Sequence, residues 1–257
     1  MQLIQHPPSE ELRPYIKSYK IVESPRRITN RVLPQTSFSM VIRYRGEISC
    51  LNGANGRPLE PAIFSGLQRS ARIIHYSPGT SAIIIVFTET GLPAFFRRPL
   101  HELFGRSVPL EEVFTTPEVA ALQDQFTASR SHARRIESLE RFLMQKLTGV
   151  RNDKLISIAI DRIDATGVNI RIKALIKELY VSQDTFEKRF RKTTGATPKQ
   201  FSHIVKMNSA ISRYKSVPRF ADLAFENGYY DQSHFNKDFK LFTGQTPTDF
   251  FQSPRFW

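Results

Sequence analysis

The stretch FEKRFRKTTGATPKQF at residues 186–201 recurs later in the chain as FNKDFKLFTGQTPTDF at residues 235–250. The identical residues in this alignment share one separation of 49 positions, which indicates an internal duplication rather than a coincidence. The pairs include Phe186 and Phe235, Lys188 and Lys237, Phe190 and Phe239, Gly195 and Gly244, Thr197 and Thr246, Pro198 and Pro247, and Phe201 and Phe250. Two copies are too few to stabilise a solenoid, so the pattern predicts a compact unit that has been duplicated.

Each copy has the residue pattern of a helix-turn-helix motif. A short apolar helix is expected over residues 172–179 in the first copy and 220–225 in the second, each followed by a tight turn. Ser182 and Asp231 are the expected caps of the second helices, because short polar side chains accept hydrogen bonds from the free amides there. Phenylalanines four residues apart then define the inward face of each second helix.

The outward faces of these second helices carry side chains that can read base edges in a major groove, since Asn and Gln suit adenine and Lys suits guanine. The candidates for base contacts are Gln183, Asp184, Glu187, Lys188, Gln232, Ser233, Asn236 and Lys237. The candidates for contacts with DNA phosphates are Arg189, Arg191, Lys192, Lys199, Lys215 and Lys240.

The second motif closely resembles that of the AraC/XylS-type transcriptional regulators. The resemblance is carried by Leu223-Ala224, Gly228-Tyr229, Asp231-Gln232-Ser233-His234-Phe235, Phe239-Lys240, Phe242, Gly244 and Thr246-Pro247, and it extends over residues 168–251 with a joining helix at 204–214. It implies a C-terminal domain that binds double-stranded DNA, an N-terminal domain that senses a small-molecule effector or mediates homodimerisation, and activation through RNA polymerase. Two rigidly joined recognition helices would enter adjacent major grooves about 34 Å apart and read an asymmetric or bent site.

The first motif departs from this family pattern at two positions. Ile176 and Tyr180 stand where the family usually has a small Ala and a turn Gly, which predicts altered packing in this motif. Asp184 and Glu187 would also face a polyanion at an electrostatic cost unless they accept from cytosine amino groups. We therefore expect the second motif to carry more of the specific readout.

The rest of the chain predicts an α+β fold, with a small antiparallel β domain and flanking helices ahead of an all-α domain of two helix-turn-helix motifs joined by a linker helix. Short β-branched and aromatic runs at 39–44, 72–76 and 81–87 alternate with turn residues, and helical spacing follows from about residue 92, interrupted near Pro99. We expect an N-terminal regulatory domain over 1–115, bridging helices over 116–167 and the DNA-binding domain over 168–257. Asp153 is a candidate helix cap next to a junction at 149–152.

The N-terminal part also resembles a less well characterised type of domain found on such regulators. His6-Pro7-Pro8, residues 12–16, Val32-Leu33-Pro34 and Gly66-Leu67-Gln68 carry this resemblance, which assigns no ligand residues. Arg97, Arg98 and Arg106 are candidates for an anionic effector, although paired arginines more often lie along a helix surface. The six histidines are scattered and Cys50 is the single cysteine, so no metal spacing is present and we expect no cofactor.

The amino-acid composition limits the possible classes of protein, but it does not show which surface binds DNA. The net charge is +13, but residues 1–150 hold 19 basic and 13 acidic side chains and residues 151–257 hold 18 and 11. A 40% hydrophobic content excludes a disordered chain, and the longest apolar run is too short for the roughly 20 residues of a membrane span. One cysteine and no signal-like start predict the bacterial cytoplasm, with the protein at the nucleoid when it is bound to DNA.

Two other classes of function stay open. An architectural protein would recognise DNA shape without reading sequence, and an enzyme domain could be fused to a DNA reader. The sequence contains no nucleophile elbow, paired metal ligands or phosphate loop in the N-terminal part, so we expect no catalytic residues.

Overall fold

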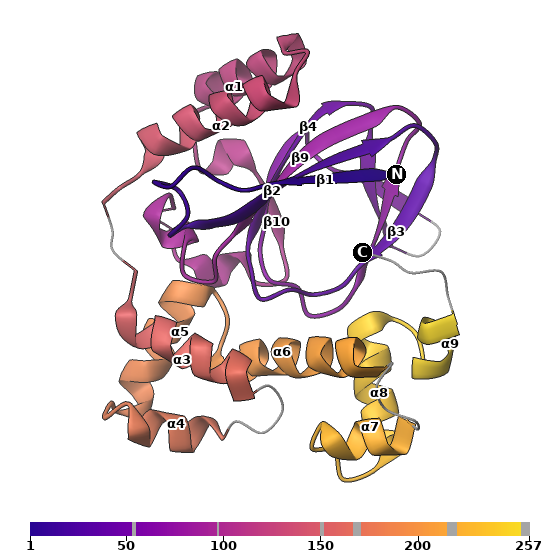
Figure 1. The fold of residues 1–257 in the computed structure, drawn as a ribbon, viewed down its shortest axis with the longest axis vertical. Helices are drawn as coiled ribbons and strands as arrows, with labels where there is room; N and C mark the ends of the chain where they lie inside the picture. The colour runs from indigo at the N-terminus through magenta and orange to yellow at the C-terminus, as the bar shows by residue number, and fades with distance from the viewer. Residues whose placement is uncertain (53–54, 97, 150–151, 167–170, 215–219, 253–257) are drawn as a thin grey trace.

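The computed structural model describes residues 1–52, 55–96, 98–149, 152–166, 171–214 and 220–252. A β-rich N-terminal part lies above a helical C-terminal part, and one long helix, α6 (Pro198–Arg213), runs between the two halves of the helical part (Figure 1). This is the predicted α+β arrangement. Within the described ranges, no helix is long and apolar enough to span a membrane.

Two antiparallel sheets form the N-terminal part. The six-stranded sheet has the order β1 (Gln2–His6), β2 (Ile16–Ser24), β9 (Thr80–Phe87), β4 (Ser39–Arg45), β7 (Ala62–Ser65) and β10 (Ser107–Pro109). The four-stranded sheet has the order β3 (Ile28–Val32), β8 (Arg72–Tyr76), β5 (Ile48–Asn52) and β6 (Asn55–Pro58). The three predicted strands are confirmed as β4, β8 and β9, whereas the three strands of the first 32 residues were missed.

The six-stranded sheet is covered on both faces. One face packs on helices α1 (Thr116–Ala128) and α2 (His132–Lys146), where the hydroxyl of Tyr19 donates to Glu140 Oε1 at 3.0 Å. The other face contributes to a small apolar cluster with the second sheet. The buried members of this cluster are Val22, Ile48, Ile74, Tyr76 and Ala82. Side chains therefore occupy the space between the sheets.

The segments between the β part and the helix-turn-helix motifs pack partly on one and partly on the other. Helices α1 and α2 pack on the β part, whereas α3 (Lys154–Thr166) contacts α5 (Gln183–Thr194) and α6 of the helical part. The interrupted helix predicted near Pro99 is two short 3₁₀ helices, η1 (Leu92–Ala94) and η2 (Leu100–Leu103). A third, η3 (Leu110–Glu112), precedes α1. The predicted junction at 149–152 includes residues 150–151, which lie outside the described residues.

Both predicted helix-turn-helix motifs are present. The helices are α4 (Ile172–Glu178), α5 (Gln183–Thr194), α6 (Pro198–Arg213), α7 (Phe220–Glu226), α8 (Gln232–Thr243) and α9 (Pro247–Gln252). The predicted caps are confirmed, because Ser182 Oγ accepts from the Thr185 amide at 3.3 Å and Asp231 Oδ1 accepts from the His234 amide at 2.7 Å. The phenylalanine pairs of α5 and α8 are fully buried, which confirms the inward face of each recognition helix.

The turn before each recognition helix has the same left-handed backbone in both copies. Tyr180 has φ +50° in the first motif, and Gly228 has φ +67° in the second. Ile176, the other departure from the family pattern, is buried with 7% of its surface exposed. The turn therefore survives the loss of glycine, but Tyr180 holds a conformation that costs a non-glycine residue about 1 kcal/mol or more.

Both recognition helices end at a left-handed glycine, and both of these ends are docked on the N-terminal part. Gly195 (φ +72°) lies against the Phe38 ring and the Leu100 carbonyl, so closely that a Cβ there would come within 2.7 Å of Phe38 Cζ. Next to Gly244 (φ +79°), Arg31 Nη1 donates to the Thr243 carbonyl at 2.6 Å. A backbone hydrogen bond of 2.7 Å, which the Ala71 amide donates to the Phe242 carbonyl, reinforces this second contact.

These two glycines form a matched pair for a stability test. We expect Gly195→Ala to destabilise the fold by about 2 to 4 kcal/mol, because it adds a clash with backbone and ring atoms to the left-handed strain. Gly244→Ala should cost only about 1 kcal/mol, since its Cβ would meet the end of the flexible Arg31 side chain at 2.8 Å. Urea unfolding of both variants checks the ranking, and equal losses would contradict the tight docking at Gly195.

Tyr180→Gly should stabilise the protein by about 0.5 to 1 kcal/mol, because glycine adopts φ +50° without strain. The tyrosine is 97% exposed, so its removal sacrifices little packing. Tyr230→Gly is the control: this residue is 98% exposed but has an ordinary φ, and glycine there should be neutral or destabilising. Thermal unfolding measures both changes, and a loss of stability in Tyr180→Gly would contradict the strain assigned to this turn.

Candidate nucleic-acid interface

The free ends of the two recognition helices carry the predicted base-contacting side chains. Because α5 and α8 are docked through their C-terminal ends, their N-terminal turns point away from the β part (Figure 1). Gln183 and Asp184 on α5, and Gln232 and Ser233 on α8, are exposed in these turns. The N-terminal residues of a recognition helix are those that contact base edges in helix-turn-helix complexes.

The next turn of each helix differs in its electrostatics. On α5, Lys188 Nζ lies 2.9 Å from Asp184 Oδ2, and Gln183 Nε2 donates to Glu187 Oε1 at 2.9 Å. Charged side chains on the surface of the first motif therefore already form an ion pair and a hydrogen bond within α5. In the described part of the chain, Lys237 of α8 is exposed and has no ion-pair partner.

Asn236 stands at the position of α8 that corresponds to Glu187, and both side chains are only half-exposed. The Asn236 Oδ1 atom is buried and has no hydrogen-bond partner among the residues that the structure describes. Its amide is therefore less open to a base edge than the neighbouring Lys237 side chain. Glu187 and Asn236 lie at the border between the exposed and the buried face of their helices. Helical spacing alone did not show that these two side chains are only partly exposed.

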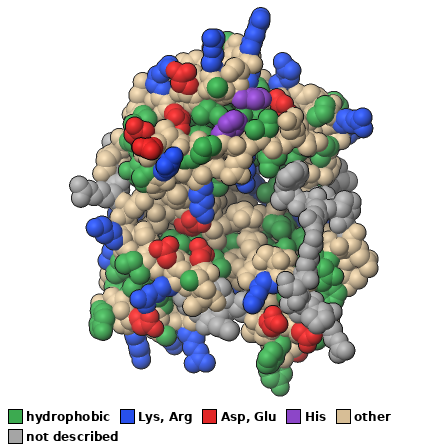
Figure 2. Space-filling view, in the orientation of Figure 1, with side chains coloured by type: hydrophobic (Ala, Val, Ile, Leu, Met, Phe, Trp, Pro, Cys, Tyr) green, Lys and Arg blue, Asp and Glu red, His purple; other side chains and the backbone are tan. Residues whose placement is uncertain are grey.

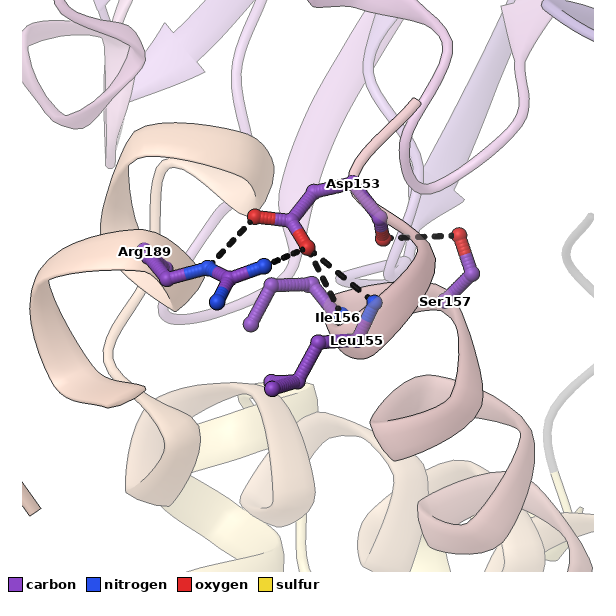
Figure 3. Close-up of polar contacts among 5 residues, drawn as sticks. All are labelled: Asp153, Leu155, Ile156, Ser157 and Arg189. Carbon is purple, nitrogen blue, oxygen red and sulfur yellow. Dashed lines mark hydrogen bonds and ion pairs between the residues drawn. The ribbon is translucent and has the colours of Figure 1, made fainter. Parts of the chain in front are cut away.

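Four of the predicted phosphate-contacting residues are exposed: Arg191, Lys192, Lys199 and Lys240. Lys215, a fifth, lies outside the described residues. Arg189 is engaged within the protein, because its Nε and Nη2 atoms donate to the two oxygens of Asp153 at 2.8 and 2.6 Å (Figure 3). Its contact with a phosphate stays a prediction that requires this pair to open.

Asp153 also caps α3, as its place in the sequence predicts. Its Oδ1 accepts from the Leu155 and Ile156 amides at 3.1 and 3.3 Å (Figure 3). The hydrogen bonds from Arg189 hold the pKa of the Asp153 carboxyl below its usual range. A single carboxylate thus joins the start of α3 to the middle of the first recognition helix.

The second recognition helix has an anchor at the corresponding position. Asp238 lies 49 residues after Arg189, and its Oδ2 accepts from the Tyr229 hydroxyl at 2.5 Å and lies 3.0 Å from His203 Nε2 of α6. Hydrogen bonding by His203, and then by Tyr229, lowers the pKa of Asp238 to about 2. Sequence reasoning missed both anchors, because the two positions carry opposite charges and their partners differ.

The surface charge does not single out one motif. On the face in Figure 2, basic side chains spread from the helices above the β part down to the first helix-turn-helix motif, with acidic groups between them. The even division of charge along the sequence is therefore also visible on this face of the molecule. On this face, the positive charge lies on individual exposed side chains rather than on a continuous basic patch.

The three arginines proposed for an effector are not brought together. Arg98 lines a cavity of about 710 Å³ between the η1–η2 segment and α5, with its side chain 3.4 Å from Glu112. Arg106 is exposed and does not line this cavity, and Arg97 lies outside the described residues. In the part of the chain that the structure describes, no three His, Cys, Asp or Glu side chains are grouped as metal ligands.

Comparison with known proteins divides the chain in two. Residues 175–253 match the model of a family described as "Helix-turn-helix domain", and residues 4–109 match a "Domain of unknown function (DUF6597)". A search of curated proteins gives no match.

Three solved structures illustrate the similar folds. ToxT from Vibrio cholerae is 13% identical with a TM-score of 0.43, and the alignment covers 90% of this chain and 96% of that one. The C-terminal domain of AraT, a response regulator from Geobacillus stearothermophilus, is 18% identical over 39% of this chain and 85% of that one, with a TM-score of 0.36. The xylose-binding transcription activator XylR is 19% identical over 46% of this chain and 38% of that one, also at 0.36.

The identities and TM-scores of these structures are too low to assign a function. The nature of the C-terminal domain is therefore inferred from the helix-turn-helix match and from the geometry of the duplicated motif. The helix-turn-helix match covers both recognition helices, their caps and the joining helix α6. The resemblance seen in the sequence is thereby confirmed. The C-terminal part of the chain is therefore an AraC-type helix-turn-helix domain, and it is joined to an N-terminal domain of unknown function.

Proposed function

We propose that this regulator reads a specific, asymmetric DNA site with α5 and α8 in adjacent major grooves. The observation that carries the proposal is the shared orientation of the two helices, whose N-terminal turns are both exposed on the side away from the β part. The 16-residue helix α6 joins them and accounts for about 24 Å of separation at 1.5 Å per residue. The turns that flank α6 must supply the remaining distance to the roughly 34 Å between adjacent major grooves.

The difference between the two helices supports an asymmetric site. Asp184 and Glu187 on α5 occupy the positions that Ser233 and Asn236 hold on α8, so the two half-sites would present different base edges. The free charge of Lys237 favours the second motif as the stronger reader. Arg191, Lys192, Lys199 and Lys240 are the proposed phosphate contacts, and Arg189 would serve as one only after release from Asp153.

We further propose that the protein activates transcription in the bacterial cytoplasm through RNA polymerase. Phe225 and Leu241 of the second motif are 80% and 72% exposed and are the apolar side chains that we propose for this contact. Homodimerisation and the sensing of an effector by the N-terminal part belong to the same proposal, with Arg98 as the effector candidate that lines a cavity. An architectural protein without base readout is the competing function.

Selection from a random duplex pool tests the base readout directly. We expect one asymmetric motif to be enriched, and Lys237→Ala to lose about 1 to 3 kcal/mol on that motif but little on random duplex. Lys240→Ala is the matched control on the same helix. It should weaken both DNAs alike and reduce the slope of log affinity against log salt by about 0.9. Enrichment of no motif, or equal losses for Lys237→Ala on both DNAs, would favour the architectural alternative.

The Asp238 anchor makes the stability of the second motif pH-dependent. Because the folded-state pKa of about 2 lies below that of the unfolded chain, the carboxylate stabilises the fold above about pH 4 and ceases to do so as the pH falls through 2. We expect Asp238→Asn to be less stable than the wild type by about 1 to 2 kcal/mol at pH 7, and the difference to vanish near pH 2.

Urea unfolding of both proteins at each pH measures this difference. Asp222→Asn, which removes an exposed carboxylate from α7, controls for the general loss of negative charge. A gap between wild type and Asp238→Asn that stays constant down to pH 2 would contradict the anchoring role.

A further inference from the structure

A second hollow lies on the β part, at the end of the six-stranded sheet where β1 and β9 begin and β2 and β4 end. Its lining starts at Met1, whose place is shown by the N mark in Figure 1. Its volume of about 580 Å³ falls within the range of about 300 to 1,000 Å³ that is typical of small-molecule sites. None of its described lining residues belongs to the helical part or to the cavity that Arg98 lines. The hollow is therefore a separate feature of the N-terminal part.

Four polar side chains of its lining form one row across these strands. Gln2 of β1 is opposite Glu23 of β2, and Glu23 is opposite Ser81 of β9. Ser81 is in turn opposite Arg45 of β4. Residues directly opposite each other in antiparallel strands point to the same face of the sheet. A carboxylate and a guanidinium thus share one face, with a hydroxyl between them and roughly 10 Å between their two strands.

A bulge in β4 brings Arg45 into this row. Arg43 is opposite Ala82, but the register then shifts, so that Arg45 rather than Tyr44 is opposite Ser81. In a regular strand Arg45 would point to the other face, because successive side chains alternate. Bulges of this kind often redirect a side chain next to a functional site. The irregular backbone of β4 thus supplies the cation of the hollow.

The two charged groups of the row do not neutralise each other. In the part of the chain that the structure describes, Arg45 is exposed and has no ion-pair or hydrogen-bond partner. Glu23 Oε1 lies 3.5 Å from His132 Nε2 of α2, and the Glu23 side chain is 38% exposed. No described ion pair joins Glu23 to Arg45 across the hollow. A carboxylate and a guanidinium are therefore both open to a ligand that lies between them.

Buried hydroxyl-bearing residues form the floor of the hollow. Ser24 and Thr80 are each 1% exposed, and their hydroxyls donate to the Arg26 and Ser77 carbonyl oxygens at 2.8 and 2.7 Å. These hydrogen bonds hold the floor in place. Ser81, which is 8% exposed, lies between the strands of the two charged residues. A polar floor between opposite charges suits a small polar molecule rather than an apolar one.

We propose that this hollow binds a free α-amino acid as its zwitterion. The ammonium group of the amino acid contacts the Glu23 carboxylate, and its carboxylate contacts the Arg45 guanidinium. Both contacts are charge-assisted hydrogen bonds, which are stronger than neutral ones. A ligand with a single charge would leave one of the two side chains unmatched. The role of the amino acid as an effector rests on the proposed function, whereas its binding requires no DNA.

Equilibrium dialysis of the full chain against each of the common L-amino acids in labelled form tests the site. We expect at least one of them to be retained at one molecule per chain. Arg45→Gln and Glu23→Gln should each weaken its binding by about tenfold or more, because each substitution removes one charge-assisted contact. Arg45 is exposed, so its substitution tests the site even if Glu23→Gln disturbs the fold.

The carboxamide of the retained amino acid separates the two contacts. It keeps the ammonium group but lacks the carboxylate, so Arg45→Gln should bind it as the wild type does. Glu23→Gln should still bind it about tenfold more weakly than the wild type. The matched controls are Glu10→Gln and Arg13→Gln, which remove exposed charges outside the hollow and should leave the affinity for the amino acid unchanged.

Retention of no amino acid would overturn the site, and so would equal affinities of the wild type, Arg45→Gln and Glu23→Gln. Duplex binding by the same proteins separates this site from the proposed function. A wild type that binds duplex but no amino acid contradicts the site alone. A wild type that binds an amino acid but no duplex contradicts the proposed function alone.

Discussion

The docking of the two recognition helices on the N-terminal part is the constraint on which the arrangement of the whole molecule depends. Each helix ends in a left-handed glycine turn, and each turn meets a different element of the β part: Gly195 meets Phe38 and Leu100, and the turn at Gly244 meets Arg31. Because the contacts use backbone carbonyls and a close glycine approach, they hold the helix ends in defined positions. The opposite ends, which carry the base-reading candidates, remain open to solvent.

A second pair of contacts holds the middle of each recognition helix. Arg189 binds Asp153 at the start of α3, and Asp238 binds Tyr229 and lies against His203 of α6. The anchored positions correspond in the duplication, although their charges are opposite. Each recognition helix is thus supported at its C-terminal end by the β part and at its middle by a neighbouring helix. Such support gives the outward side chains a defined direction.

Some residues proposed to contact DNA therefore also lie at the junction between the two parts of the chain. The face of α5 that carries Arg191 and Lys192 also lines the cavity beside η2. The N-terminal part packs its own sheets around a small apolar cluster, and it meets the helical part through a wall that is apolar on one side and basic on the other. Side chains of the first recognition helix thus form part of the junction between the two parts of the chain.

The sequence by itself determined the duplicated motif, the caps at Ser182 and Asp231, the buried phenylalanines and the type of the C-terminal domain. The caps and buried faces follow from spacing and cap chemistry within about 20 residues of each copy, and the offset of 49 positions between the copies reveals the duplication. It did not reveal the first strands, because β2 buries polar residues such as Ser18 and Ser24 and so lacks a clear alternation. Only the tertiary structure decided that Arg189 faces Asp153, that Arg31 holds the second motif and that a cavity adjoins α5. These contacts join residues 36 to 212 positions apart, and neither composition nor local periodicity specifies which distant side chains meet.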